Sequence, residues 1–318
     1  MRRLFLTILS VLLFSAFSRA QENKIVFMPH WTPQAQFAGY YVAFEKGFYK
    51  DAGIDVEIRH IGHNSRKNSA SYLRSGEINM TSLHLLQAMV NKDGGFDIVN
   101  VLQTSQNSSI LCVGHDPLPN FNTLEGKKVG MWKTGFTETA IIAADETDVY
   151  YQTIPFLFGI NLFVAGAIDA TLVTSYNEFK QLYYSVGNVP EENVLKFSEI
   201  GYNYPEDGLY TTADFYNQNQ ELVRKFAEAS KRGWEYAAAH KEETLKIVEK
   251  YTVEANIATN EVLQREMLDE ILKLQLDSKT GQRSFAPVSK ELFDEILFKC
   301  KSAGLIMGDI DYNEFIKQ

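Results

Sequence analysis

A strand–loop–helix–strand unit near the start of the chain limits the fold more than any other feature. The pattern predicts a strand over residues 24–28 and then a loop that carries Trp31 and Pro33. A helix over residues 35–46 follows, and a glycine ends it before a second strand, residues 54–58. Such units build a mainly parallel sheet with helices on both faces, and ligands usually bind over the carboxyl ends of its strands.

The alternation of strands and helices continues through the first two hundred residues. It predicts, in order, a helix over Ser65–Ser75, a strand over Ile78–Ser82, a helix over Leu83–Asn91, a strand over Asp97–Leu102 and a strand over Ile110–Val113. From Asp214 onward the periodicity becomes helical, with helices expected over Asn217–His240, Lys241–Tyr251, Asn260–Leu274 and Ser289–Ala303. The α/β part is therefore followed by a helical part.

The first twenty residues have the pattern of a secretory signal peptide. Arg2 and Arg3 precede a mostly apolar run, and small residues lead up to Ala20, so cleavage is expected before Gln21. The run is short for an uncleaved membrane anchor, which needs about 20 apolar residues. No cysteine lies near the cleavage site to carry a lipid. We therefore expect a secreted, periplasmic protein.

The charge of the chain excludes some partners. The whole chain has 31 Lys and Arg residues against 40 Asp and Glu, and without residues 1–20 the balance becomes 28 against 40, a net charge of −12. Nucleic acid and anionic membranes are poor partners for such a chain. Cys112 and Cys300 are the only cysteines, and we expect two separate buried thiols, although the compartment permits a disulfide.

The chain resembles the ThiY-like family of periplasmic substrate-binding proteins, which deliver pyrimidine precursors of thiamine to ABC importers. The shared features are the Trp31-x-Pro33 loop, the helix that ends in Gly47-Phe48-Tyr49 and the run Ala52–Val56. A Leu-x-Gly-Lys-Lys-Val-Gly run at Leu124–Gly130 is shared across many type II binding proteins. The sulfonate- and taurine-binding proteins are similar as well, so the resemblance leaves the ligand open.

The resemblance implies a type II periplasmic binding fold, in which two α/β lobes are joined by two crossing strands. Lobe one should contain residues 24–106 and 203–318, and lobe two residues 107–202, with residues 194–200 returning the chain to lobe one. It also implies a monomer that binds a small nitrogen-bearing aromatic molecule between the lobes and delivers it to an ABC permease. No cofactor, resident metal or catalytic residue is expected.

Aromatic and polar residues of the first lobe are candidates for ligand contact. Trp31 stands in a polar loop and could stack on a flat ligand. Phe37 and Tyr41 lie four residues apart on one helix face, where they could equally pack together. Asn64, before the next predicted helix, could cap it or face the ligand. Ser82 and His84 follow a strand in the same way. Near the predicted return crossing, one or two of Tyr202, Tyr204, Asp207 and Tyr210 should reach the cleft.

Trp132 and the loop after it provide the candidates at the start of lobe two. Thr134, Gly135 and Thr137 follow the strand that Trp132 ends, and Thr137 is a suitable cap for the helix predicted over residues 139–144. Unpaired N–H groups at such a helix start attract a carboxylate, a phosphate or a ring nitrogen. We therefore expect this loop to line the cleft.

Tyr176, Asn177 and Glu178 follow the strand that ends near Val173 and complete the candidate site. In the ThiY-like family an acidic residue at the position of Glu178 accepts hydrogen bonds from the pyrimidine amino group. A sulfonate site would avoid a buried carboxylate, because the two anions repel. The alternative is that Glu178 only starts a solvated helix.

Three other functions stay open. The chain could bind a sulfonate such as taurine, act as the sensing lobe of a membrane kinase, or be a pyrimidine-synthesis enzyme of the same fold. The enzyme is disfavoured because the sequence has no Gly-x-Ser-x-Gly, no phosphate-binding loop and no paired histidine–acid metal signature. The fungal synthases of this fold carry a cysteine-rich motif, whereas this chain has two distant cysteines.

Overall fold

The computed structural model describes residues 23–62, 65, 67–133, 135–156 and 159–318. The expected signal peptide, residues 1–20, lies outside the described residues. Among the helices of the described residues, none combines the length and the apolar character that a membrane crossing requires.

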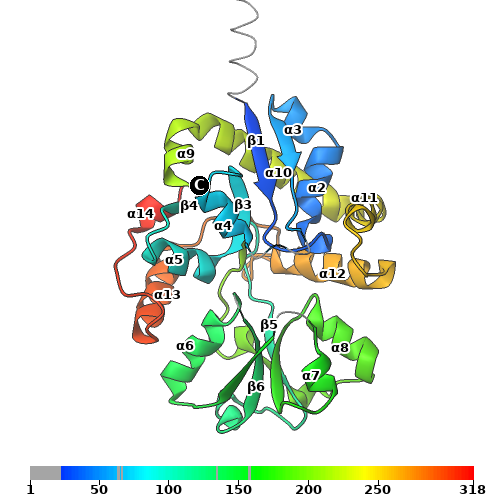
Figure 1. Cartoon of the computed structure of the whole chain (residues 1–318), viewed down its shortest axis with the longest axis vertical. Helices are drawn as coiled ribbons and strands as arrows, with labels where there is room; N and C mark the ends of the chain where they lie inside the picture. Colours follow the sequence, from blue (N-terminus) through cyan, green and yellow to red (C-terminus); the bar gives the residue numbers. More distant parts are fainter. Residues whose placement is uncertain (1–22, 63–64, 66, 134, 157–158) are drawn as a thin grey trace, which may run out of the picture.

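Two five-stranded sheets form the centres of two lobes, one above the other in Figure 1. The strands of sheet A, in lobe one, are β1 (Lys24–Met28), β2 (Asp55–Ile58), β3 (Met80–His84), β4 (Ile98–Gln103) and β10 (Asp207–Thr212). The strands of sheet B, in lobe two, are β5 (Ile110–Gly114), β6 (Lys128–Trp132), β7 (Gln152–Phe156), β8 (Ala170–Thr174) and β9 (Val194–Lys196). The expected architecture of two α/β lobes is confirmed.

Each sheet is mainly parallel but contains one antiparallel strand that comes from outside the local alternation. The order of sheet A is β2-β1-β3-β10-β4, and β10 runs antiparallel to both β3 and β4. The order of sheet B is β7-β6-β8-β5-β9, and β5 runs antiparallel to β8 and β9. Strands β3, β4, β5 and β8 are buried along their whole length, as expected for sheets that are covered on both faces.

Helices cover both sheets. Those of lobe one are α2 (Ala38–Glu45), α3 (Phe48–Asp51), α4 (Ser69–Arg74), α5 (Leu85–Asp93), α9 (Ala213–Gln218), α10 (Gln220–Ala239), α11 (Lys241–Glu254), α12 (Glu261–Leu274), α13 (Lys290–Ser302) and α14 (Tyr312–Phe315). Those of lobe two are α6 (Glu138–Thr147), α7 (Asn161–Val164) and α8 (Glu178–Val186). Helix α13 extends down from lobe one toward α6 of lobe two (Figure 1).

The chain passes between the lobes along two segments, residues 104–109 and 197–206. The first joins β4 to β5, and the second joins β9 to β10. Residues 194–196 were expected to belong to the return crossing, but they form β9 and pair with β5 in sheet B. The return therefore starts later than expected, after Lys196.

Helices α2 and α10 approach closely because each has a glycine at the contact. A Cβ atom added to Gly233 would lie 2.0 Å from the carbonyl oxygen of Gly39, and one added to Gly39 would lie 2.2 Å from the ring of Trp234. The Trp234 ring fills the interior of lobe one and is 1% exposed. This contact fixes the long helix α10 against the helix of the first strand–helix–strand unit.

Several predicted element boundaries were wrong, each for a local reason. Helix α4 starts at Ser69 and not at Ser65, because the Asn68 side chain caps it by accepting a hydrogen bond from the backbone N–H of Ser71. The helix expected over residues 217–240 is two helices, since the backbone of Asn219 leaves the helical conformation between α9 and α10. Strand β3 extends through His84, so α5 starts two residues later than expected.

The two cysteines are confirmed as separate buried thiols. Cys112 lies in β5 and Cys300 in α13, and neither forms a disulfide. Burial raises the pKa of both thiols to about 12, so neither is a thiolate near neutral pH.

Candidate functional site

Two histidines and an aspartate meet at the edge of sheet A that faces lobe two. His30 follows the end of β1, and His84 is the last residue of β3. Since β1 and β3 are parallel, their carboxyl ends lie at the same edge. The antiparallel β10 begins at this edge, and its first residue, Asp207, pairs in register with His84. We call these three residues the His–His–Asp cluster.

The Asp207 carboxylate lies at the centre of the cluster. Its Oδ1 atom is 3.0 Å from Nε2 of His84 and 4.0 Å from Nε2 of His30. The 3.0 Å contact is an ion pair when His84 is protonated, and otherwise both of its atoms are buried without a hydrogen-bond partner among the described residues. The other carboxylate oxygen, Oδ2, accepts a hydrogen bond of 2.9 Å from the Gln36 amide.

The protonation states of the cluster follow from burial and from the central carboxylate. Burial lowers the pKa of His30 to about 4, although the neighbouring Asp207 acts in the opposite direction. Burial also opposes protonation of His84, but the Asp207 carboxylate outweighs it and raises the pKa of His84. The two imidazoles in turn outweigh the effect of burial on Asp207 and lower its pKa. At neutral pH Asp207 is therefore ionised and His30 is a neutral imidazole.

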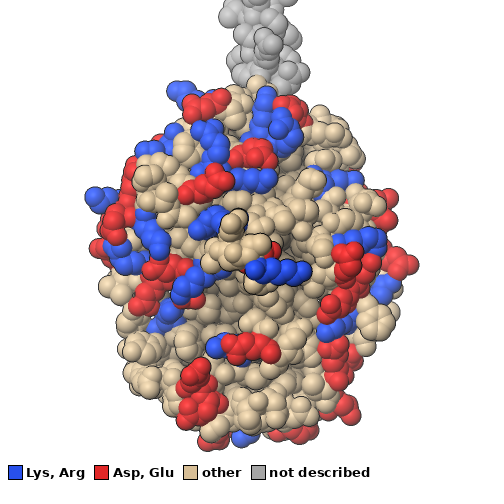
Figure 2. Space-filling view, turned by 180° about the vertical axis from the view of Figure 1, so that it is seen from behind, with Lys and Arg blue, Asp and Glu red and all other residues tan. Residues whose placement is uncertain are grey.

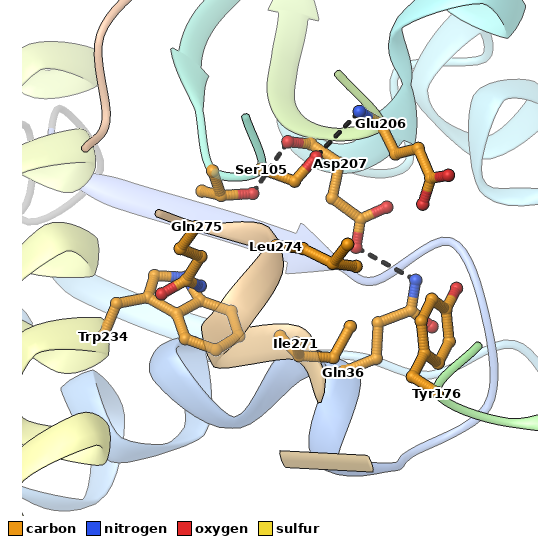
Figure 3. Close-up of a pocket in the computed structure, with 10 residues that line it drawn as sticks. Gln36, Ser105, Tyr176, Glu206, Asp207, Trp234, Ile271, Leu274 and Gln275 are labelled. Atoms are coloured by element: carbon orange, nitrogen blue, oxygen red, sulfur yellow. Dashed lines mark hydrogen bonds between the residues drawn. The ribbon is translucent and has the colours of Figure 1, made fainter. Parts of the chain in front are cut away.

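A small cavity lies beside the cluster and takes its lining from both lobes. Figure 3 shows Gln36 pointing toward Asp207, with the Tyr176 ring of lobe two beside Gln36. Ile271 and Leu274 of α12 provide apolar lining. The cavity volume is about 10 Å³, which suffices for about one water molecule. In this arrangement of the lobes the cavity is too small for an organic ligand.

The loop after β6 brings lobe two onto the cluster. The Phe136 ring lies against His84, with ring centroids 3.6 Å apart, and its other neighbour is Trp132 at 5.0 Å. Phe136 has a φ of 62°, a left-handed conformation that is uncommon for a bulky residue. A Cβ atom added to Gly135 would lie 3.4 Å from the Gln87 amide of α5. This loop is therefore in close contact with lobe one.

Polar contacts at both rims also join the lobes. On one side, Lys299 of α13 lies 3.3 Å from the Glu146 carboxylate of α6. On the other side, the Tyr184 hydroxyl of α8 donates a 2.6 Å hydrogen bond to Glu266 of α12. The surface shows charged side chains of both signs spread over the two lobes (Figure 2). The two lobes are thus in contact at both rims.

Six of the site residues expected from the sequence lie at or near this inter-lobe region. His84 belongs to the cluster, and the Ser82 hydroxyl lies 2.8 Å from Nδ1 of His30. The Phe37 ring lies 5.2 Å from the His30 ring, edge to face. From lobe two, the region receives Trp132, Gly135 and Tyr176. Their role in ligand binding stays a prediction.

Three expected residues of lobe two have local roles in the structure. The Glu178 carboxylate is 7% exposed and accepts hydrogen bonds from the hydroxyl and N–H of Thr174, at 2.7 and 3.2 Å. Its other oxygen accepts a 3.2 Å bond from the Asn177 amide. Glu178 therefore starts a helix, as one reading expected, but it is buried rather than solvated. Thr137 was expected to cap α6; it occupies the cap position, but its side chain makes no capping hydrogen bond.

The remaining expected residues pack in the apolar cores or lie outside the described residues. Tyr41 is buried in lobe one, stacked on Tyr251 at 4.1 Å. Trp31 is partly buried and packs against the same apolar core. Tyr204 is buried beside Tyr202 in a second apolar cluster. Asn64 and Thr134 lie outside the described residues.

Sequence reasoning did not select His30 or Gln36 as site residues, and Asp207 was only one of four residues near the return crossing of which one or two were expected to reach the cleft. The sequence contains no short histidine–acid metal motif, but the fold brings two histidines and an aspartate together from three distant positions. The available signals were His30 directly before the Trp31 loop and Asp207 in an irregular turn before a strand. Neither signal shows that the two residues meet, because no local sequence pattern predicts the pairing of β10 with β3.

A larger pocket opens on the side of lobe one. Its volume is about 340 Å³, and its lining includes Pro33, His60, Gly62 and Tyr251. The His60 ring is 3.1 Å from the Tyr41 hydroxyl and has its pKa lowered to about 4 by burial. In the part of the chain that the structure describes, all residues that line this pocket belong to lobe one.

Comparison with known proteins places the fold in a family. The sequence profile described as "NMT1/THI5 like" matches residues 34–244, which is more than half of the chain. The chain is 26% identical to the riboflavin-binding protein RibY of Chloroflexus aurantiacus, over 92% of this chain and 86% of that protein. It is 21% identical to the formylaminopyrimidine-binding protein of Halalkalibacterium halodurans, over 85% of this chain and 82% of that protein.

Similarity extends to an enzyme and to a solved binding protein. The 4-amino-5-hydroxymethyl-2-methylpyrimidine phosphate synthase of Candida albicans is 24% identical, over 70% of this chain and 69% of the enzyme. The periplasmic aliphatic sulphonate-binding protein of Escherichia coli superposes with a TM-score of 0.64 at 14% identity, over 93% of this chain and 92% of that one. At that identity the superposition shows a shared periplasmic binding protein fold.

Proposed function

Because this chain belongs to the NMT1/THI5-like family, we propose that it captures a nitrogen-bearing heteroaromatic solute between its lobes for an ABC importer. In this proposal the signal peptide, residues 1–20, directs the chain to the periplasm. The mature protein acts there as a monomer and presents the closed, loaded form to a permease in the inner membrane.

The names of the relatives support this class of ligand. One relative is named for riboflavin, one for formylaminopyrimidine, and the synthase for an aminopyrimidine phosphate. All three molecules contain a pyrimidine ring, alone or fused, with ring nitrogens and polar substituents. A pyrimidine precursor of thiamine is the specific ligand that we propose.

The arrangement of the inter-lobe region carries the proposal. A ring from lobe two, Phe136, lies directly on His84 of lobe one, next to the buried Asp207 carboxylate and the Gln36 amide. Rings suit the faces of a flat heterocycle, whereas a carboxylate and an amide suit its amino groups and ring nitrogens. A second anion beside Asp207 would be repelled, which disfavours a sulfonate.

We further propose that the lobes move as two bodies. Lobe one would comprise residues 24–106 and 203–318, and lobe two residues 107–202, with the motion taken up in the two crossings. Hinge closure around a ligand is common in two-lobe binding proteins. The closed cavity of about 10 Å³ supports this, since an organic ligand of ordinary size needs a pocket of about 300 Å³ or more.

A binding experiment tests the proposal. Protein without residues 1–20 is dialysed against EDTA and titrated calorimetrically with riboflavin, formylaminopyrimidine and an aminopyrimidine alcohol, and with taurine as the control. We expect one equivalent of a heterocycle to bind and taurine not to bind. Trp31→Ala should weaken binding by about 1–3 kcal/mol if its ring stacks on the ligand. Binding of taurine alone would contradict the proposal.

The similarity to named synthases supports a second candidate, an enzyme of pyrimidine synthesis. The two candidates differ in one observable, because a binding protein returns its ligand unchanged. Incubation of each heterocycle with excess protein, followed by mass spectrometry of the released small molecules, separates them. We expect the input ligand to be recovered, and a new product would favour the enzyme.

A further inference from the structure

Two imidazole nitrogens and a carboxylate oxygen converge in the His–His–Asp cluster without satisfying one another. The ligand atoms of His30, His84 and Asp207 all lie within 4.8 Å of one another. We propose that these three residues bind a late first-row divalent cation, with Zn²⁺ as the reference ion, at the floor of the cleft. This goes beyond the proposed function, because the cation needs no organic solute to bind.

The spacing of the donors fits a small cation. In a tetrahedral zinc site with bonds of about 2.0–2.1 Å, neighbouring ligand atoms lie about 3.3 Å apart. Oδ1 of Asp207 lies 3.0 Å from Nε2 of His84 and 4.0 Å from Nε2 of His30, so the two distances bracket that value. The two imidazole nitrogens lie within 4.8 Å of each other and must approach when the cation binds.

The unsatisfied atoms of the cluster provide independent support. Nε2 of His84 and Oδ1 of Asp207 are buried, and neither has a hydrogen-bond partner among the described residues. Buried polar atoms are nearly always paired, because leaving one unpaired costs about 1–3 kcal/mol. These are the two atoms that a cation between His84 and Asp207 would coordinate.

Hydrogen bonds on the side away from the proposed cation hold His30 and Asp207 in place. The Ser82 hydroxyl lies 2.8 Å from Nδ1 of His30, and with the ring proton on Nδ1 the Nε2 lone pair faces Asp207. The Gln36 amide donates to Oδ2 of Asp207 at 2.9 Å, which leaves Oδ1 for the cation. Such outer contacts orient ligands in metal sites. The same Gln36 amide nitrogen is 3.5 Å from Nε2 of His30, and the cation displaces this longer contact.

The donor set defines the kind of ion. Two imidazoles and one carboxylate suit Zn²⁺, Co²⁺ and Ni²⁺, whereas Mg²⁺ and Ca²⁺ prefer sites made of oxygen. Three protein ligands leave at least one coordination position open. Water or a donor atom of the solute can occupy that position.

Cobalt provides the direct test, because Co²⁺ replaces Zn²⁺ and absorbs visible light when imidazoles coordinate it. Tag-free protein without residues 1–20 is stripped with EDTA, exchanged into metal-free buffer and titrated with Co²⁺, and Zn²⁺ is then added as a competitor. We expect one equivalent of Co²⁺ to produce visible bands that Zn²⁺ abolishes. Absence of the bands, or bands at several equivalents without saturation, overturns the proposal.

Matched variants locate the site. His30→Gln, His84→Gln and Asp207→Asn should each abolish the bands, whereas His60→Gln and His115→Gln, at histidines outside the cluster, should retain them. Ser82→Ala removes the outer contact with the His30 ring, together with the hydrogen bond from the His30 backbone N–H, and should weaken Co²⁺ binding about 10–100-fold. Bands that persist in His30→Gln and His84→Gln overturn the assignment to the cluster.

Two further measurements separate the possible causes of failure. Circular dichroism and thermal melting in EDTA show whether each variant is folded, and only folded variants are titrated with Co²⁺. The three substitutions in the cluster test the site independently, so one misfolded variant leaves the other two informative. The heterocycle titrations of the proposed function are run in EDTA. Metal binding without heterocycle binding therefore contradicts only the proposed function, and the reverse contradicts only the metal site.

Discussion

The Glu206 carboxylate accepts two hydrogen bonds from Ser109, one of 2.5 Å from its backbone N–H and one of 2.8 Å from its hydroxyl. The Ser108 hydroxyl donates a third, at 3.0 Å. Ser109 ends the first crossing between the lobes and Glu206 ends the second, so one buried side chain joins the two crossings. Burial raises the pKa of Glu206. The contact between Glu206 and Ser109 therefore belongs to the two crossings and not to either lobe.

Replacing Glu206 tests whether the shape or the charge of its side chain stabilises the contact between the two crossings. In Glu206→Gln, the amide oxygen can accept from the Ser109 N–H and the amide nitrogen can donate to its hydroxyl, so we expect a change in unfolding free energy of less than about 1 kcal/mol. Glu206→Ala leaves the buried Ser109 N–H unpaired and should cost about 1–3 kcal/mol. Urea unfolding of both variants measures the difference. Equal losses for Gln and Ala would show that the negative charge itself is required.

Glu178→Gln separates a structural role of this carboxylate from a role in ligand recognition. An amide oxygen in the place of Oε2 can keep both contacts with Thr174, but the amide NH2 then faces the Asn177 amide that donated to Oε1, so we expect a loss of about 1 kcal/mol in stability. If the carboxylate also receives the ligand amino group, affinity for an aminopyrimidine should fall by a further 1.5–3 kcal/mol or so. Thermal melting and calorimetric titration of the same preparation measure the two effects. Unchanged affinity with lowered stability would restrict Glu178 to its loop.

Acid should destabilise the protein partly through His60. Its pKa is lowered to about 4 in the folded state by burial, against about 6.5 in the unfolded chain. Between these values the unfolded state binds the extra proton, so stability falls as pH drops, by up to about 1.4 kcal/mol per pH unit. His60→Gln should reduce this slope between pH 6 and 4.5 by about one proton. His30 has a shift in the same direction and keeps part of the slope in the variant. An unchanged slope in His60→Gln would show that His60 is protonated in the folded protein.

Gly233→Ala tests the close approach of α2 and α10. Helix propensity alone would favour alanine by about 1 kcal/mol. The added Cβ would lie 2.0 Å from the Gly39 carbonyl oxygen and 2.8 Å from the Ala43 Cβ, so the helices must separate. We expect a net loss of about 1–3 kcal/mol in the free energy of unfolding. Gly62→Ala, where an added Cβ has no neighbour within 4 Å, is the control. A stabilised Gly233→Ala would contradict the close contact.

Local sequence patterns predicted the elements that local forces determine. The unit of β1, α2 and β2 was expected because its apolar runs and glycine stops lie within one short stretch, and the late helices α11 to α13 were expected from their periodicity. Caps at Asn260 and Ser289 place the starts of α12 and α13 within one residue of expectation. Competing caps explain the errors, as at Asn68 before α4.

The candidate site was less predictable, because it depends on contacts between distant residues. Tyr176 and His84 were selected from their positions after strands, and both lie in the inter-lobe region. His30 was not selected, and Asp207 was not singled out among the four residues near the return crossing, since the cluster forms only through the antiparallel pairing of β10 with β3. Glu178 was selected for its charge. The hydrogen bond that its carboxylate accepts from the Thr174 hydroxyl could be recognised only in the folded loop.

The position of β10 between β3 and β4 also dictates the order in which a nascent chain can fold. Until residues 207–212 have been synthesised, β3 and β4 have an empty place between them and expose two unpaired strand edges. All strands of sheet B lie within residues 110–196, so the second lobe can assemble earlier, while the first remains incomplete. Open edges of this kind pair readily with other chains. The nascent chain therefore depends on protection from aggregation until β10 has been synthesised.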